Sequence, residues 1–324
     1  MRIATMNARK TFFYLLRLDS KKAMRKVLLF CAAVILAGCT IEGPVPVSTL
    51  VDQSMPSPTF SGERAYRDVL AQVEFGPRVP GSQAHRITGE WIVNEMLAAG
   101  WEAEFQPFEY GGYSLRNIIA IPGGGADTSA PLILGAHYDT RMLADKDENT
   151  PHEPVPGAND GASGVAVLLE LARVLDTNSL ERSVWIVFFD AEDNGRIQGW
   201  DWILGSRYFV DQLEIDPSAA VIADMVGDED LQLFYESNSD PVLRQSIWEV
   251  AASLGFEEFK AEEKYSILDD HTSFLQAGIP AVDIIDFDYP FHHTTQDLPD
   301  KVSAESLAIV GRTLEVWLEE GREF

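Results

Sequence analysis

The chain has 324 residues, of which 51 are Asp or Glu and 25 are Lys or Arg, so its formal net charge is −26. A surface this acidic repels phosphate backbones, which excludes nucleic-acid binding. Hydrophobic residues make up 46% of the chain, enough for a packed core, so a wholly disordered chain is excluded. The 2 cysteines are too few for a disulfide scaffold or a cysteine-rich zinc site.

The amino-terminal segment has a composition unlike the rest of the chain. Its first 38 residues contain eight of the bases and one acid, so the remaining 286 residues carry a net charge of −33. Met24-Arg25-Lys26 precedes an apolar run over Val27–Ala37, which is too short to span a bilayer as a helix because about 20 residues are needed. A basic start and a short apolar core predict a secretory signal peptide.

The end of this apolar run suggests how the mature chain is attached. Cys39 follows Leu-Ala-Gly, which resembles the lipobox of bacterial lipoproteins, where the cysteine is lipidated and becomes the first mature residue. An ordinary signal peptide with an incidental cysteine is the alternative. We therefore expect a signal region over residues 1–39, with 1–23 as a candidate over-extended start because Met24 suits a signal peptide's first residue.

Residues 40–60 are rich in Pro, Ser and Thr without helical periodicity, which predicts an extended tether. Together these segments predict an exported protein of the bacterial cell envelope, on its periplasmic or extracellular face. Its only attachment to the membrane would be a lipid at Cys39.

From residue 61 onward, signals for helices and strands alternate. Ser61 can cap a first helix, and Gly100 ends a second one. The expected helices are one beginning at Ser61, then His85–Ala99, Gly164–Leu175 and Ser303–Glu319. The expected strands are Trp101–Phe108, Asn117–Ile121, Pro131–His137, Ser183–Phe189, Ala219–Asp224 and Ala281–Phe287, with a turn at Gly123–Gly125.

Most of these strands are continuously apolar and do not alternate with polar residues. Such strands, interleaved with helices, indicate a mainly parallel sheet that is covered by helices on both faces. No internal repeat or linker interrupts residues 61–324. We therefore expect one catalytic α/β domain over 61–324, with a three-layer α/β/α architecture.

Acids and a histidine stand where several strands end. His137 ends one strand, Asp190-Ala191-Glu192-Asp193 follow the next, and Asp224 ends a third. Because ligands bind at the carboxyl ends of parallel strands, these residues should converge in one crevice. So many carboxylates in one place repel each other, and a divalent cation is the simplest group that would neutralise this repulsion. Because no thiols are available, the ligands of the cation must be His and carboxylate, which suits catalytic zinc.

Each of these residues also has a structural interpretation. Asp160 could cap the helix that follows it, and His137 could be a hydrogen-bonded residue at a strand end. Glu192 with Asp193, and His292 with His293, could be solvated, and we expect His85 and His152 to be structural. We expect a solvated acidic face in the loop that contains Asp139, Asp145, Asp147, Glu148 and Glu153.

The joint order of seven motifs resembles a known family, the zinc-dependent aminopeptidases and glutaminyl-peptide cyclotransferases (glutaminyl cyclases). The resemblance covers about residues 65–320 and implies a mixed, mostly parallel central sheet. The motifs are AHYDT at 136–140, GANDGASG at 157–164, FFDAED at 188–193, LGSRYF at 204–209, ADMVGD at 223–228, DDHTSF at 269–274 and FHHTTQD at 291–297.

The resemblance implies roles for these residues. The metal ligands would be His137, Asp160 as a bridge, Asp193, Asp224 and His293. Aminopeptidases use all five positions for two zinc ions, whereas cyclases use the positions of Asp160, Asp193 and His293 for one. Glu192 would be the general acid/base and not a ligand.

Several features favour the cyclase branch. They are VPGSQAH at 79–85, LRNIIA at 115–120 and the Asp269-Asp270 pair, in which Asp270 would join an acidic hydrogen-bond network beside Glu192. Two positions depart from the cyclase pattern. His292 stands where animal cyclases usually carry a tryptophan, so the pocket would lose an indole wall. Asp193 stands where glutamate is the commoner ligand, so its shorter side chain must bring the backbone closer to the metal.

The favoured activity is therefore conversion of an N-terminal Gln to pyroglutamate with release of ammonia, on peptide or protein N-termini. The alternative is a zinc aminopeptidase that uses a water at the metal, and a second alternative is a non-catalytic binding ectodomain of the same fold. The aromatic residues nearest these motifs could either pack in the core or form the wall of a substrate pocket. The candidate wall residues are Trp200, Trp202, Phe287, Tyr289 and Phe291, together with His292.

Overall fold

A mixed six-stranded sheet organises the computed structural model, which describes residues 59–123 and 130–324. The sheet order is β1-β2-β4-β3-β5-β8. Strands β4, β3, β5 and β8 run parallel, whereas β1 and β2 form an antiparallel hairpin on one edge. The bounds are β1 Trp101–Tyr110, β2 Tyr113–Pro122, β3 Leu132–His137, β4 Val184–Phe189, β5 Ala219–Asp224 and β8 Ala281–Ile285.

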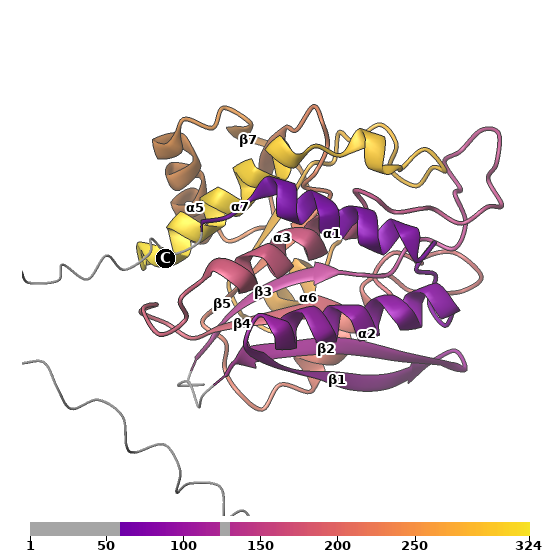
Figure 1. Ribbon diagram of the computed structural model, residues 1–324, viewed down its shortest axis with the longest axis horizontal. Helices are drawn as coiled ribbons and strands as arrows, with labels where there is room; N and C mark the ends of the chain where they lie inside the picture. Colours follow the sequence, from indigo (N-terminus) through magenta and orange to yellow (C-terminus); the bar gives the residue numbers. More distant parts are fainter. Residues whose placement is uncertain (1–58, 124–129) are drawn as a thin grey trace, which may run out of the picture. The chain divides into compact units, whose positions relative to one another are not determined.

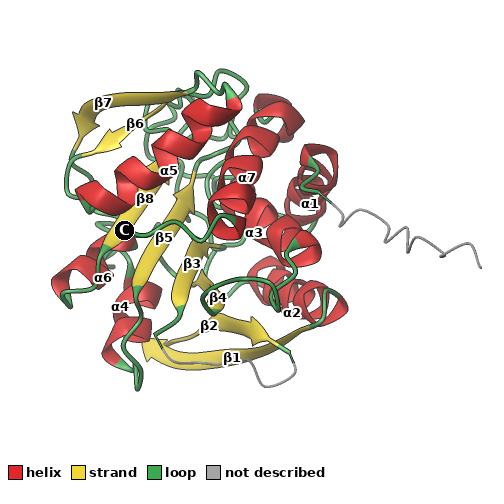
Figure 2. Cartoon of the chain, turned by 90° about the vertical axis from the view of Figure 1, so that its left-hand side faces the viewer, coloured by secondary structure: helices red, strands yellow, loops and turns green. Residues whose placement is uncertain are grey.

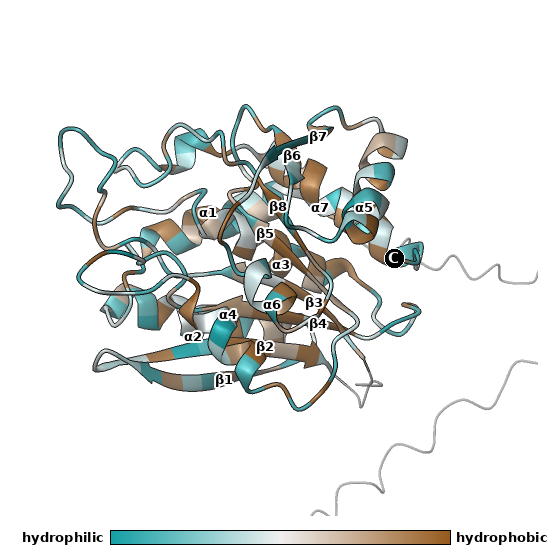
Figure 3. Ribbon diagram, turned by 180° about the vertical axis from the view of Figure 1, so that it is seen from behind, coloured by the Kyte–Doolittle hydropathy of each residue, from teal (hydrophilic) through white to brown (hydrophobic). Residues whose placement is uncertain are grey.

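The parallel strands are apolar throughout because both faces of the sheet are buried. Leu132, Leu134 and Ala136 of β3 pack into the larger core, whereas Ile133 packs into a second core on the opposite face. Neighbouring strands divide their side chains in the same way. Figure 3 shows these strands as a hydrophobic interior surrounded by more hydrophilic loops. A two-sided burial of this kind requires helices on both faces.

Helices form the two outer layers (Figures 1 and 2). On one face, α3 packs on β3 and β5, α1 and α7 pack on α3, and α2 covers β1 and β2. On the other face, Phe209 of α4 and Phe274 of α6 pack against Phe189 of β4. The bounds are α1 Gly62–Glu74, α2 Gln83–Ala98, α3 Ala162–Val174, α4 Leu204–Asp211, α5 Pro241–Leu254, α6 His271–Gln276 and α7 Ala304–Glu319.

The expected three-layer α/β architecture is confirmed, and its strands and helices agree closely with the expected ranges. Ser61 caps α1 by accepting a hydrogen bond from the backbone N–H of Arg64, and Ser303 caps α7 in the same way. The signal region over 1–39, almost all of the tether and the Gly124-Gly125 part of the expected turn lie outside the described residues. The domain boundaries therefore remain predictions.

Several elements were not expected from the sequence. Strands β6, Leu233–Glu236, and β7, Phe259–Tyr265, form a separate two-stranded sheet, and a 3₁₀ turn spans Pro299–Lys301. Helix α5 carried readable signals, because Asp240 caps it, Pro241 is its first residue and Gly255 follows its end at φ 81°. Strand β7 is largely exposed and polar, so it lacks the apolar run that revealed the central strands.

The helices of the described residues include none that is both long and apolar enough to cross a membrane.

Candidate active site

The carboxyl ends of β3, β4 and β5 lie together at one edge of the sheet. The strand register places His137 of β3 opposite Phe189 of β4, so the loop that begins at Asp190 continues from the same level. On the other side of β3, Gly135 pairs with Ile222, which brings the end of β5 at Asp224 to this edge. The expected convergence of strand-end residues is therefore present in the structure.

Asp160 joins two groups of side chains that could each hold a cation. In the first, Nε2 of His137 lies 3.1 Å from Oδ1 of Asp160 and 3.1 Å from Oδ1 of Asp224. In the second, Nε2 of His293 lies 2.7 Å from Oδ1 of Asp193 and 3.8 Å from Oδ2 of Asp160. The five residues are almost completely buried. The structure thus brings together all five of the expected ligands, while their role as ligands stays a prediction.

The donor set fits a divalent metal. Among the described residues, Oδ2 of Asp160 and Oδ2 of Asp193 are buried without a hydrogen-bond partner. Burial and the charge of Asp160 raise the pKa of Asp193 well above its usual range, so this carboxylate is unstable as an anion without a compensating cation. Imidazole nitrogens and carboxylate oxygens without thiols form the ligand chemistry of catalytic zinc.

The ring nitrogens that face away from these groups also point at carboxylates. Nδ1 of His137 lies 3.4 Å from Oδ1 of Asp139, and Nδ1 of His293 lies 3.9 Å from Oδ1 of Asp145. Carboxylates placed behind a histidine fix the orientation of its ring, as they do around metal-bound histidines.

The loop before α3 holds Asp160 in place through glycine conformations and buried donors. Gly157 and Gly161 have φ values of 72° and 69°, and a Cβ at Gly161 would lie 2.8 Å from the carbonyl oxygen of His137. Helix α3 is capped at Gly161 without a side-chain hydrogen bond, so the alternative that Asp160 serves as the helix cap is wrong.

Two further residues fix this loop from outside it. The guanidinium of Arg78 donates to the carbonyl oxygens of Pro156 and Gly157 at 2.5 Å each. The carboxylate of Asp297 accepts the backbone N–H groups of Asn159, at 2.8 Å, and Asp160, at 3.1 Å. Asp160 therefore sits on a segment whose backbone is held at several points.

Asp139 is a buried scaffold for the Glu192 loop, and the expectation that it belongs to a solvated acidic face is wrong. Its side chain is 0% exposed. Oδ1 accepts the backbone N–H of Glu192 at 3.0 Å, and Oδ2 accepts the N–H of Asp193 at 3.4 Å and Nδ2 of Asn194 at 3.1 Å. Asp147 is also buried, whereas Asp145, Glu148 and Glu153 are exposed as expected.

Glu192 lies in an environment that favours its protonated form. Its side chain is 7% exposed. Burial and the charges of neighbouring carboxylates, first among them Asp269, raise the pKa of Glu192 well above its usual range. Burial and the charge of Asp269 also raise the pKa of Asp270, which is fully buried. Both Asp269 and Asp270 thus disfavour the ionisation of Glu192, whereas the sequence had implied this role for Asp270 alone.

Backbone strain is concentrated beside these residues. Ala191, which precedes Glu192, has a φ of 57°, Met225, which follows Asp224, has a φ of 46°, and His293 itself has a φ of 61°. Non-glycine residues rarely adopt this conformation, and it costs about 1–3 kcal/mol at each position. The surrounding packing must compensate for this strain, which is typical of functional sites.

Of the expected pocket walls, Trp202 lies against His293 and Trp200 does not. The indole of Trp202 stacks on His293, with ring centroids 6.1 Å apart, and the guanidinium of Arg141 lies 4.8 Å from the Trp202 ring. Trp200 is almost buried and packs against Tyr110 and Tyr113 of the β1–β2 hairpin.

The remaining candidates lie on the segment that leads to His293. His292 is within 3.8 Å of Oδ2 of Asp160, and its Nδ1 accepts a hydrogen bond from Lys146 at 3.0 Å. Tyr289 is buried and donates its hydroxyl to Asp297, so it supports the Asp160 loop, and Phe291 packs on its ring. Phe287 is 37% exposed and lies edge-on to His292. Their contacts with a substrate stay predictions.

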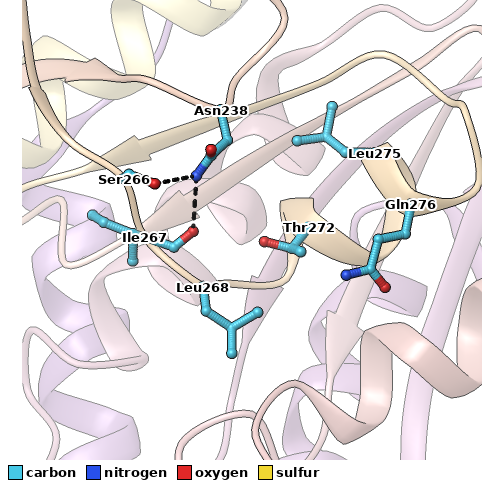
Figure 4. A pocket seen from close by; sticks show the side chains of 7 residues that line it. All are labelled: Asn238, Ser266, Ile267, Leu268, Thr272, Leu275 and Gln276. Carbon is cyan, nitrogen blue, oxygen red and sulfur yellow. Dashed lines mark hydrogen bonds between the residues drawn. The ribbon is translucent and has the colours of Figure 1, made fainter.

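A separate pocket is lined by residues that precede and follow the Asp269–His271 segment in the chain (Figure 4). Its volume is about 600 Å³, and none of the expected site residues lines it. Its walls are Asn238, Ser266, Ile267, Leu268, Thr272, Leu275 and Gln276.

Sequence reasoning did not identify the residues that support the site from behind. Arg78 and Asp297 lie far from Asp160 in the chain, and nothing in the local sequence marks them as its neighbours. His85 was expected to be structural, and it is buried against Asp190, with Nε2 2.7 Å from Oδ1. Asp139 could have been recognised from the sequence as a supporting residue, because it lies two residues after the end of β3, where the site residues were expected.

Comparison with known proteins identifies the family. Residues 117–318 match the peptidase family M28, so the chain belongs to that family. This assignment confirms the resemblance that the ordered motifs indicated.

The similar proteins include both cyclases and peptidases. A glutaminyl-peptide cyclotransferase of Drosophila melanogaster is 27% identical over an alignment of 282 positions, which covers 73% of this chain and 75% of the relative. The structure of a glutaminyl cyclase from Bacteroides thetaiotaomicron has a TM-score of 0.76 and 33% identity and covers 82% of this chain and 100% of its own. A Zn-dependent exopeptidase from Parabacteroides distasonis has a TM-score of 0.75 and 29% identity and covers 81% of this chain and 99% of its own.

The scaffold role of Asp139 predicts a large difference between two acids of the same loop. Asp139→Ala leaves three buried N–H groups without their acceptor and should lower the free energy of unfolding by about 3 kcal/mol. Glu148→Ala, at an exposed position, should change it by less than about 0.5 kcal/mol. Denaturant titration of both variants measures this difference, and equal effects would show that Asp139 does not support the loop.

Proposed function

We propose that this protein is a zinc-dependent enzyme that acts on peptide N-termini as a glutaminyl-peptide cyclotransferase. The observation that carries the proposal is a buried carboxyl group, Glu192, beside the two histidine–carboxylate groups that share Asp160. Membership of the M28 family and 33% identity to a solved bacterial glutaminyl cyclase support it.

The metal would be held by residues that the structure already brings together. Asp160, Asp193 and His293 would hold one zinc ion, and the same Asp160 with His137 and Asp224 would hold a second if two are bound. In the cyclase reaction zinc polarises the side-chain amide of the substrate's N-terminal Gln. The similarity to a solved Zn-dependent exopeptidase supports the choice of zinc.

Glu192 would move the proton that the reaction requires. The α-amine of the N-terminal Gln forms a bond with the carbon of its own side-chain amide, and the bond from that carbon to the amide nitrogen breaks. Glu192 takes a proton from the attacking amine and delivers it to the departing nitrogen, which leaves as ammonia. A raised pKa suits Glu192 for both halves of this transfer.

Other residues around Glu192 would position the substrate or the proton. The carboxyl groups of Asp269 and Asp270 keep Glu192 in an acidic network that discourages its ionisation. Trp202 would form one wall of the pocket because it stacks on His293, and His292 would form the wall that other cyclases build from tryptophan.

A metallo-aminopeptidase is the second candidate function. The completeness of the five-residue ligand set, including His137 and Asp224, favours it, as does the similarity to the Zn-dependent exopeptidase. In that reaction Glu192 would take a proton from the attacking water and deliver it to the departing amine. No observation favours the non-catalytic alternative, because competent side chains fill every expected site position.

We also propose that the enzyme acts in the bacterial cell envelope, tethered by a lipid at Cys39. The basic and apolar signal region and the Leu-Ala-Gly-Cys sequence support this location.

The two activities release different products. With zinc-loaded protein and a Gln-initiated peptide, we expect ammonia and a pyroglutamyl peptide, because the amine attacks within the same residue. A Leu-initiated peptide should remain intact. Free leucine or free glutamine in amino-acid analysis would instead establish the aminopeptidase, and the absence of all these products would contradict both candidates.

Glu192→Gln should separate proton transfer from metal binding. The amide cannot accept the proton, so kcat should fall by about 10²-fold or more while the metal content stays the same. Metal analysis and steady-state kinetics on the same preparation measure both quantities. Turnover equal to that of the parent protein would refute the general acid/base role.

Metal stoichiometry distinguishes the two ligand groups. For a cyclase we expect about one zinc per chain, lost in His293→Gln and retained in His137→Gln. If two ions bind, His137→Gln should reduce about two equivalents to one. His152→Gln, at an exposed position, is the matched control. Retention of all zinc in His293→Gln would contradict its assignment as a ligand.

A further inference from the structure

A further histidine–carboxylate group, centred on His271, is not used by the proposed mechanism. His271 is the first residue of α6 and is 0% exposed. Its Nε2 lies 3.2 Å from Oε2 of Glu236, at the end of β6, and its Nδ1 lies 3.5 Å from Oδ2 of Asp283, on β8. One imidazole ring therefore stands between carboxylates from two different strands.

Glu236 is fixed in place and is stabilised as an anion. Its carboxylate accepts the backbone N–H and the hydroxyl of Ser239, the backbone N–H of Ile267 and the amide of Asn238. Although burial opposes ionisation, the hydrogen bond from His271 and these donors lower the pKa of Glu236 to about 2. Both ring nitrogens of His271 are buried without a hydrogen-bond partner of standard geometry among the described residues, and Nε2 lies 3.2 Å from Oε2 of Glu236. Because the anion of Glu236 can only accept, a proton on Nε2 is the arrangement that satisfies both groups.

The same donors tie Glu236 to the chain that leads into the site. The amide of Asn238 donates to Oε1 of Glu236 at 2.7 Å. It also donates to Oγ of Ser266 at 2.9 Å, which Figure 4 shows. Ser266 begins the short segment that continues through Leu268 to Asp269 and Asp270. The position of Glu236 is thus linked to the position of these two acids.

Apart from His271, the described residues provide no partner that could neutralise the carboxylate of Asp283. It is 0% exposed, and neither of its oxygens is hydrogen-bonded within the described part of the chain. Burial and the charges of Asp269, Asp224, Glu236 and Asp270 raise its pKa well above the usual range. A proton between Nδ1 of His271 and Oδ2 of Asp283 satisfies both groups, whether it resides on nitrogen or on oxygen.

We propose that Glu236, His271 and Asp283 form a hydrogen-bonded relay that fixes the start of α6 and, with it, the adjoining Asp269–Asp270 segment. His271 is then a positioning residue, because it directly follows Asp270 and links β6, β8 and α6. Each of its ring nitrogens shares one proton with a carboxylate. This role rests on the proposed function, since it acts through the acidic neighbours of Glu192.

A bound cation is the alternative to a hydrogen-bonded relay at this group. Asp269, His271 and Asp283 each offer an atom within 4.8 Å of the others, so a cation between them would also neutralise the group. A cation would require a bare Nδ1, whereas the relay requires a proton on the line to Asp283.

Nuclear magnetic resonance of the zinc-loaded protein, labelled with ¹⁵N-histidine, tests the relay without any activity assay. We expect two hydrogen-bonded protons, one between Nδ1 of His271 and Asp283 and one between Nε2 of His271 and Glu236. Their signals are assigned by their loss in His271→Gln. If that variant does not fold, Asp283→Asn should shift the Nδ1 signal alone. The absence of any hydrogen-bonded proton between Nδ1 and Asp283, or a metal equivalent lost with His271, would overturn the proposal.

Kinetics test the positioning role. His271→Gln should lower kcat for the Gln-initiated peptide by about 10-fold or more, with KM and zinc content unchanged, because only the neighbours of Glu192 move. Thr313→Val is the matched control, since it also removes a buried hydrogen bond, to the carbonyl of Ile309, but lies in α7. Equal kcat losses in both variants, or a loss confined to KM, would overturn the proposal.

A failure of the proposed function would appear differently. The parent protein would then release no ammonia, while the resonances of His271 would still report whether the relay exists.

Discussion

The structure depends on the burial of many carboxyl groups at one edge of a parallel sheet. Asp160, Asp193 and Glu192 are each almost completely removed from water, and so are their neighbours Asp139 and Asp270. An ionised carboxylate is very costly to bury unless hydrogen bonds or opposite charges compensate it. At this edge of the sheet, backbone N–H groups, guanidinium groups and histidines supply that compensation.

Different acids are compensated by different means. Asp139 and Asp297 accept backbone N–H groups, so their charge also fixes the loops that carry the site. Arg141 donates to the carbonyl of Asp193 and lies against Trp202. Asp160 and Asp193 each retain one buried oxygen, Oδ2, without a partner among the described residues, and a metal ion would complete them. Structural and catalytic acids are thus distinguished by their partners and not by their exposure.

The strained residues show how rigidly this arrangement is held. Ala191, Met225 and His293 adopt left-handed conformations next to the residues that would bind the metal or move the proton. A cyclase and an aminopeptidase can share such a scaffold because both need a cation and a carboxyl group that carries a proton. His292, at the position where animal cyclases usually carry tryptophan, would change a pocket wall without changing the scaffold.

The sequence by itself determined the architecture, the family and the set of residues at the strand ends. Apolar runs mark strands buried on both faces, and a parallel sheet brings their carboxyl ends to one edge, so His137, Glu192, Asp193 and Asp224 could be grouped from chain position alone. Strand β7 and the supporting residues could not be found in this way, because β7 has no buried face to mark it. Nor does sequence distance show that Arg78 reaches Gly157 or that Asp297 reaches Asp160. Only the tertiary structure decided which acids are exposed and which are buried, because burial depends on what packs around a side chain, and this is why Asp139, expected in solvent, proved to be part of the scaffold.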